Sequence, residues 1–72
     1  MNVSDRVVGT DLSPRQREVM GQLCLGLRDR EIANRLGVSI ETVRTHVAFI
    51  RKKLGVGTRT GAVARWLWRG SR

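Results

Sequence analysis

The sequence predicts an all-α fold of four helices, and three observations support this fold class. Apolar residues recur three and four positions apart in four successive segments, as on the buried face of a helix. A glycine, which commonly ends a helix, follows each of the first three segments. The chain has 72 residues, which form one small domain with room for three or four short helices and no deep catalytic cleft. We expect residues 1–11, which show no periodicity, to be a flexible N-terminal arm, and residues 12–69 to form the domain.

The first predicted helix has a strong start signal. Ser13 can cap it, Pro14 suits its first position, and Gln16 completes a capping box with the serine. The helix should continue to about Leu25 and stop at Gly26. Its buried face should carry Val19, Met20, Leu23 and Cys24.

The second predicted helix is short and runs from about Asp29 to Leu36. Gly37 should end it in the left-handed conformation. Arg28 occupies the capping position, where a serine or threonine would accept a backbone hydrogen bond, so this start should be held less firmly. The residues expected to face inward are Ile32, Ala33 and Leu36.

The third predicted helix begins behind Ser39 and ends at Leu54, before Gly55. At ~1.5 Å per residue it is about 22 Å long, which is ample to lie across a DNA major groove. Helical periodicity gives it a core side that consists of Val43, Val47, Ile50 and Leu54, with His46 at the edge. The opposite side holds Glu41, Thr45, Ala48 and Lys52, flanked by Arg44, Phe49, Arg51 and Lys53.

The net charge of +8 is concentrated in one part of the chain. Residues 1–41 carry six Arg and six acidic residues, whereas residues 42–72 carry six Arg, two Lys and no acid. Such a one-sided distribution favours a polyanionic partner, with nucleic acid first and an anionic membrane second. Two helices followed by a tight turn and a long basic helix are also the order expected of a helix-turn-helix.

The outer side of the third helix supplies the candidate DNA contacts. Arg44 could donate two hydrogen bonds to a guanine, while Thr45 and the methyl group of Ala48 could contact base edges or thymine methyl groups. Phe49 could pack on a thymine methyl or cover a neighbouring helix. The candidate phosphate contacts are Arg30, Ser39, Thr42, Lys52 and Lys53, with His46 as a packing histidine that could also donate to a phosphate.

Catalytic and metal-binding functions find no support in the residue pattern. Cys24 is the only cysteine and His46 the only histidine, so neither a metal cluster nor a nucleophile paired with a base is indicated. We therefore expect no enzyme activity, no cofactor and no metal. The sequence also lacks a signal-like segment near Met1 and an apolar stretch of membrane-spanning length, so we expect a cytoplasmic protein without a membrane partner.

Several blocks of residues, taken together, resemble the LuxR-type helix-turn-helix domain, the family of LuxR, FixJ and NarL. The resemblance covers residues 12 to about 67, and the blocks recur in the family's order and spacing. They are Leu12-Ser13-Pro14-Arg15-Gln16-Arg17-Glu18-Val19, Gly26-Leu27, Glu31-Ile32-Ala33, Leu36-Gly37-Val38-Ser39, Thr42-Val43-Arg44-Thr45-His46 and Lys53-Leu54-Gly55-Val56.

The resemblance implies a four-helix domain in which the third helix reads DNA and the fourth forms a two-fold dimer. The family's base-contacting positions fall on Arg44, Thr45 and Ala48. Its phosphate-contacting positions fall near Arg30, Thr42, His46, Lys52 and Lys53. The chain departs from the family at Ala48, where members often carry a polar or basic side chain. It departs again at Gly61, which replaces a common Glu that would close a capping box with Thr58.

The fourth predicted helix begins behind Thr58 and contains two tryptophans. Trp66 and Trp68 lie two positions apart and therefore point about 200° away from each other. We expect Val63, Leu67 and part of Trp66 to be buried, and Trp68 to present an outer apolar surface. The predicted dimer interface is Val63, Trp66, Leu67 and Trp68.

These observations favour a sequence-specific transcriptional regulator that binds double-stranded DNA as a homodimer, with RNA polymerase as a further candidate partner. One alternative is a promoter-binding module similar to sigma-factor region 4, which shares the Leu-Ser-Pro-Arg opening. Another is a protein-interaction module whose basic helix docks an acidic partner. The chain could be a complete small regulator or the output domain of a longer one, and Met1 favours the first.

Overall fold

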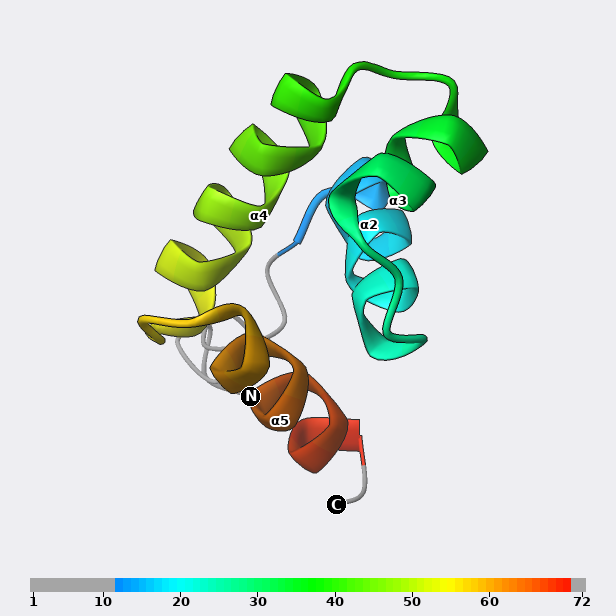
Figure 1. The fold of residues 1–72 in the computed structure, drawn as a ribbon. Coiled ribbons are helices and arrows are strands. Elements are labelled where there is room, and N and C mark those ends of the chain that lie inside the picture. The colour runs from blue at the N-terminus through cyan, green and yellow to red at the C-terminus, as the bar shows by residue number, and fades with distance from the viewer. Residues whose placement is uncertain (1–11, 71–72) are drawn as a thin grey trace.

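The computed structural model of the chain describes residues 12–70, and this part of the chain contains four helices and no strand (Figure 1). The all-α fold class is therefore confirmed. The predicted N-terminal arm, residues 1–11, lies outside the described residues. The helices are α2 (Pro14–Cys24), α3 (Asp29–Leu36), α4 (Ile40–Leu54) and α5 (Arg59–Gly70).

The predicted start of α2 is confirmed by its hydrogen bonds. The Ser13 hydroxyl accepts a hydrogen bond from the Gln16 backbone N–H at 3.1 Å, and the Gln16 side chain accepts one from the Ser13 N–H at 3.0 Å. This reciprocal pair satisfies two of the N–H groups that a helix start leaves without partners. Gly37 and Gly55 end α3 and α4 with φ of 69° and 71°, a left-handed conformation that other residues rarely adopt.

The start of α3 is held by Glu31 rather than by a side-chain cap. Arg28 is the residue before the helix, and its backbone N–H donates to the Glu31 carboxylate at 2.8 Å. Its own side chain makes no capping bond, as expected for an arginine at this position. Half of a capping box is therefore present, and the contribution of Glu31 is a feature that the sequence patterns did not predict.

The core lies where α4 crosses the other helices. α4 packs against α2, α3 and α5, and α2 also contacts α5. In Figure 1, α4 (green to yellow) runs along one side of the molecule and α5 (orange to red) lies beyond its C-terminal end. The buried apolar residues are Leu12, Val19, Met20, Leu23, Ile32, Ala33, Val43, Val47, Ile50, Leu54 and Ala62.

Two residues predicted to face the core lie at its boundary. Leu36 and Cys24 are half-buried and pack against the central cluster. Burial raises the pKa of the Cys24 thiol above its ordinary value. The shift favours the protonated, less nucleophilic form of the thiol, and the side chain contributes to packing at the edge of the core.

The prediction that Leu67 is buried was wrong. Ala62 is fully buried, while Val63 and Trp66 are half-buried against the core. Leu67 is 55% exposed and Trp68 is 63% exposed. At about 100° per residue, Leu67 points roughly 140° away from Ala62, whereas Trp66 points only about 40° away. The inward stripe of α5 therefore follows Ala62 and Trp66, and the outer apolar surface includes Leu67 as well as Trp68.

The start of α5 is capped by Thr58. Its hydroxyl accepts a hydrogen bond from the Gly61 backbone N–H at 2.9 Å. A Cβ added at Gly61 would lie 3.0 Å from that hydroxyl oxygen, tighter than an ordinary contact, so a larger side chain at position 61 would require the cap to shift. The threonine thus supplies one half of a capping box, and glycine leaves the other half unfilled.

Candidate nucleic-acid interface

The outer face of α4 is the candidate interface, and its orientation agrees with the helical pattern of the sequence. Val43, Val47, Ile50 and Leu54 are all buried, which confirms the predicted core side, and His46 is half-buried at the edge. The opposite side is open to solvent and carries Glu41, Arg44, Thr45, Ala48 and Lys52. The three predicted base-reading residues, Arg44, Thr45 and Ala48, therefore share one exposed surface.

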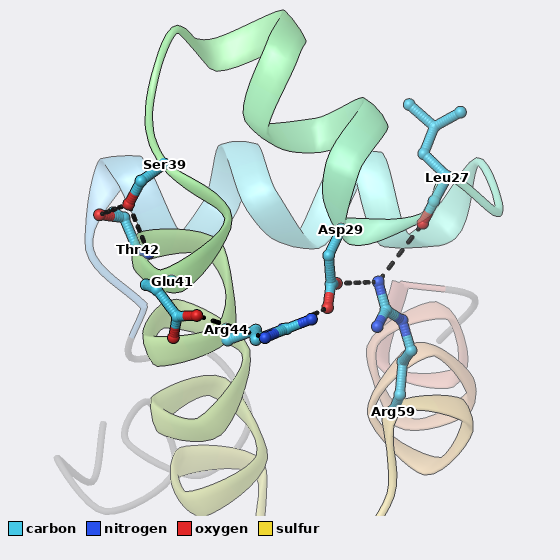
Figure 2. A network of polar contacts seen from close by, with 7 residues as sticks. All are labelled: Leu27, Asp29, Ser39, Glu41, Thr42, Arg44 and Arg59. Carbon is cyan, nitrogen blue, oxygen red and sulfur yellow. Dashed lines mark hydrogen bonds and ion pairs between the residues drawn. The ribbon is translucent and has the colours of Figure 1, made fainter.

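The first turn of α4 is organised by two hydroxyl groups. The Ser39 Oγ accepts from the Thr42 backbone N–H at 3.1 Å and lies 2.9 Å from the Thr42 Oγ1, with which it shares a second hydrogen bond (Figure 2). Ser39 is exposed and Thr42 is half-buried. The serine is therefore the helix cap, and both predicted phosphate-contacting hydroxyls lie next to the backbone N–H groups of the helix start.

Arg44 is held between two carboxylates from different helices. Its Nη1 donates to the Glu41 Oε2 at 3.3 Å within α4, and its Nε lies 3.6 Å from the Asp29 Oδ2 at the start of α3. Figure 2 shows the guanidinium extending from α4 toward Asp29. The exposed arginine thus has a preferred direction before any ligand is present.

Asp29 also binds the first residue of α5. The Arg59 Nη2 donates to the Asp29 Oδ1 at 2.6 Å and to the Leu27 carbonyl oxygen at 3.4 Å (Figure 2). One carboxylate therefore joins α3 to α4 through Arg44, and to α5 through Arg59. Neither Asp29 nor Arg59 was predicted as a site residue, because they are 30 positions apart and only the fold brings them together.

The other basic residues of α4 differ in their surroundings. Lys52 and Lys53 are exposed near the C-terminal end of α4, and Arg30 is exposed at the start of α3. Arg51 is half-buried, and its Nη1 donates to the Gly57 carbonyl oxygen at 3.0 Å. Arg51 therefore supports the connection between α4 and α5, a role that its place beside the predicted reading side did not indicate.

Neither a metal-holding cluster nor a membrane-spanning helix occurs in the part of the chain that the structure describes. Within residues 12–70, no three or more His, Cys, Asp and Glu side chains come together in a way that could hold a metal ion. In the same part of the chain, no helix combines the length and the apolar character needed to cross a bilayer. The candidate interface is therefore the exposed face of α4, which carries Arg44, Thr45 and Lys52.

Comparison with protein families identifies the kind of domain that carries this face. The model of the family described as "Bacterial regulatory proteins, luxR family" matches residues 10–66. The chain belongs to this LuxR family. The match includes the whole of α2, α3 and α4 and most of α5, so the LuxR-type resemblance of the sequence is confirmed.

Curated relatives of this LuxR-family chain are named as transcriptional regulators. A Streptomyces halstedii protein named "Probable HTH-type transcriptional regulator GfsR" is 46% identical over 56 residues, which cover 78% of this chain and 23% of the relative. The transcriptional regulatory protein MctR of Rhizobium johnstonii is 39% identical over 56 residues, which cover 76% of this chain and 26% of MctR. LnrK of Bacillus subtilis, also named a transcriptional regulatory protein, is 44% identical over 52 residues, which cover 72% of this chain and 24% of LnrK.

The chain spans about a quarter of the length of these relatives, at 23%, 26% and 24%. The similarity therefore concerns the LuxR-family domain and not the remainder of those proteins. It supports the LuxR interpretation over the alternative of a module similar to sigma-factor region 4.

Proposed function

We propose that residues 12–69 form a sequence-specific DNA-binding domain of a transcriptional regulator, with α4 in the major groove. The observation that carries this proposal is the exposed surface of Arg44, Thr45 and Ala48 on a helix whose opposite side is buried in the core. A helix fixed by its core side can present the same side chains to DNA in a constant register. Membership of the LuxR family and the names of the relatives support the same function.

The three reading residues have different capabilities. Arg44 can donate two parallel hydrogen bonds to the O6 and N7 atoms of guanine. Thr45 can offer a hydroxyl to a base edge or a methyl group to thymine, and Ala48 can offer only a methyl group. Phe49 is 49% exposed and can add apolar contact at the edge of this surface. The domain would therefore recognise one guanine strongly and neighbouring thymines by their methyl groups.

The phosphate contacts are assigned to residues around this surface. Lys52 and Lys53 follow the reading residues along α4, and Arg30 stands at the start of α3. Ser39, Thr42 and His46 lie nearer the first turns of α4. Contacts of these kinds fix the register of a protein on the duplex without reading its sequence.

Lys52→Ala should weaken binding to all DNA sequences about equally. The exposed ammonium group contributes charge and no base contact, so we expect a loss of about fivefold at moderate salt and a decrease of about one in the slope of log K against log [salt]. Fluorescence anisotropy on a selected and a random duplex over a salt series measures both quantities. A loss confined to the selected duplex would contradict the phosphate assignment.

The functional unit is proposed to be a homodimer joined through α5. Leu67 and Trp68 form an exposed apolar surface on this helix, and Val63 and Trp66 adjoin it at the edge of the core. A two-fold pairing of this surface would place two copies of α4 on successive major grooves. The corresponding DNA site is a pseudo-palindrome with half-sites about 10 base pairs apart.

Trp68→Ala should raise the dimer dissociation constant about tenfold, because large aromatic side chains contribute most of the binding energy at such interfaces. Sedimentation equilibrium without DNA measures the change. Phe49→Ala, which removes an exposed aromatic side chain from α4, is the matched control and should leave self-association unaltered. Equal effects of the two substitutions on the dissociation constant would show that α5 does not form the dimer interface.

Selection from a pool of random duplexes tests the proposed function directly. The purified chain should enrich a two-fold symmetric site, and its affinity for that site should decline steeply with salt. An acidic protein partner is the alternative use of the basic helix, and it predicts that no sequence is enriched. Failure to enrich any sequence at moderate salt, where binding through phosphates alone is weakened, would therefore overturn the proposal.

A further inference from the structure

We propose that Asp29 is a positioning residue for base reading, and that it orients the Arg44 guanidinium toward guanine. The inference rests on the proposed function, because it concerns how the main reading residue is presented to DNA. Asp29 lies on α3, outside the surface of α4 that should contact bases. Its effect on specificity would pass through Arg44 alone.

The two carboxylates contact different nitrogens of the Arg44 guanidinium. Asp29 lies 3.6 Å from Nε, the nitrogen nearest the backbone, whereas Glu41 accepts from the terminal Nη1 at 3.3 Å. If the pair with Asp29 persists on DNA and the pair with Glu41 opens, neither carboxylate occupies the terminal nitrogens of Arg44, which are then available to a base. Those two nitrogens form an edge that can donate in parallel to guanine O6 and N7.

Burial distinguishes which carboxylate should stay in place. The Asp29 side chain is 23% exposed, while that of Glu41 is 82% exposed. Asp29 is also bound through its other oxygen by Arg59 at 2.6 Å, so its position is fixed by α5 as well as by its own helix. Within the described residues, no second ion pair anchors Glu41, and its exposed pair with Arg44 is of the weak surface kind.

The energetic benefit is preorganisation of a flexible side chain. An arginine loses rotamer freedom when it is fixed against a base, and a support that already limits its directions lowers that cost. Nearby phosphates would repel the Glu41 carboxylate, which favours its release from Arg44. Arg59 offsets the negative charge of Asp29, so the support itself adds little repulsion toward DNA.

Asp29→Asn tests the inference, because asparagine keeps the shape and retains one oxygen for Arg59 but loses the charge that faces Arg44. Two duplexes serve as probes: the selected site, and the same site with the guanine read by Arg44 replaced by adenine. We expect the affinity ratio between them to decline about two- to fivefold, the range of an exposed ion pair. Both duplexes sample the same folded fraction, so a loss of stability cancels from the ratio.

Controls separate this role from general charge and structure. Glu18→Gln changes the net charge equally within the exposed Arg15–Glu18 pair of α2 and should leave the ratio unaltered. Asp29→Asn combined with Arg44→Ala should leave the ratio as it is in Arg44→Ala alone. The inference is overturned if Asp29→Asn weakens both duplexes equally, if it alters the ratio without Arg44, or if Glu41→Gln reduces the ratio instead.

The same experiment distinguishes failure of this inference from failure of the proposed function. If Arg44→Ala leaves the guanine preference of the chain intact, the assignment of Arg44 as a base reader is wrong, and Asp29 has nothing to position. If Arg44→Ala removes the preference and Asp29→Asn does not, Arg44 reads DNA without this support.

Discussion

Replacement of Arg44 by alanine should cost about 1 to 3 kcal/mol in binding to the selected DNA site and much less on random DNA. The guanidinium is exposed on the outer face of α4, where two parallel hydrogen bonds to one guanine are available only to arginine or lysine. The variant should also lose its preference for guanine at one position in each half-site. Competition binding with all four bases at that position measures the change.

The control for Arg44→Ala must remove a positive charge elsewhere on the domain. Arg17→Ala does so on the exposed side of α2, and it should reduce affinity slightly and by the same factor for every duplex. Arg44→Ala should also leave the thermal midpoint nearly unaltered, since its ion pairs with Glu41 and Asp29 are exposed or only partly buried. Equal losses on selected and random DNA would show that Arg44 contacts phosphate and reads no base.

Local signals in the sequence predicted the orientation of α4 correctly. A helix with Val43 and Val47 four residues apart, followed by Ile50 and Leu54, can bury all four only in one rotational setting. That setting also determines that Arg44 and Thr45 face outward. Ser39 and Gly55 fixed the two ends for equally local reasons, a side-chain cap and a left-handed φ of 71°.

Contacts between distant segments could not be read from the sequence. The pair of Asp29 and Arg59 depends on how α3 meets α5, and no periodicity within either helix encodes that meeting. Leu67 was misplaced because the hydrophobic pattern of α5 contains more apolar positions than a small core can cover. Helical periodicity placed Arg51 on the flank of the outer side of α4, but its long side chain donates a hydrogen bond to the Gly57 carbonyl oxygen.

Replacement of Ile50 by alanine should destabilise the whole domain by about 2 to 5 kcal/mol. The side chain is fully buried on the core side of α4, so its removal loses apolar contacts and leaves a cavity. Domains of this size rarely have more than about 3 to 5 kcal/mol of stability, so a large fraction of the variant should be unfolded at 37 °C. Thermal melting followed by circular dichroism measures the loss.

Two neighbouring substitutions make the Ile50 prediction specific to the core side of α4. Ile50→Val removes one methylene group and should cost about 0.5 to 1.5 kcal/mol, which leaves the domain folded. Phe49→Ala removes a larger side chain from the adjacent position, but that side chain is exposed, so its cost should be about 1 kcal/mol or less. If Phe49→Ala proved as destabilising as Ile50→Ala, the side of α4 assigned to the core would be wrong, and with it the outward direction of Arg44. Because DNA binds only the folded state, the Ile50→Ala variant should also lose affinity for every sequence, in contrast to the selective loss caused by Arg44→Ala.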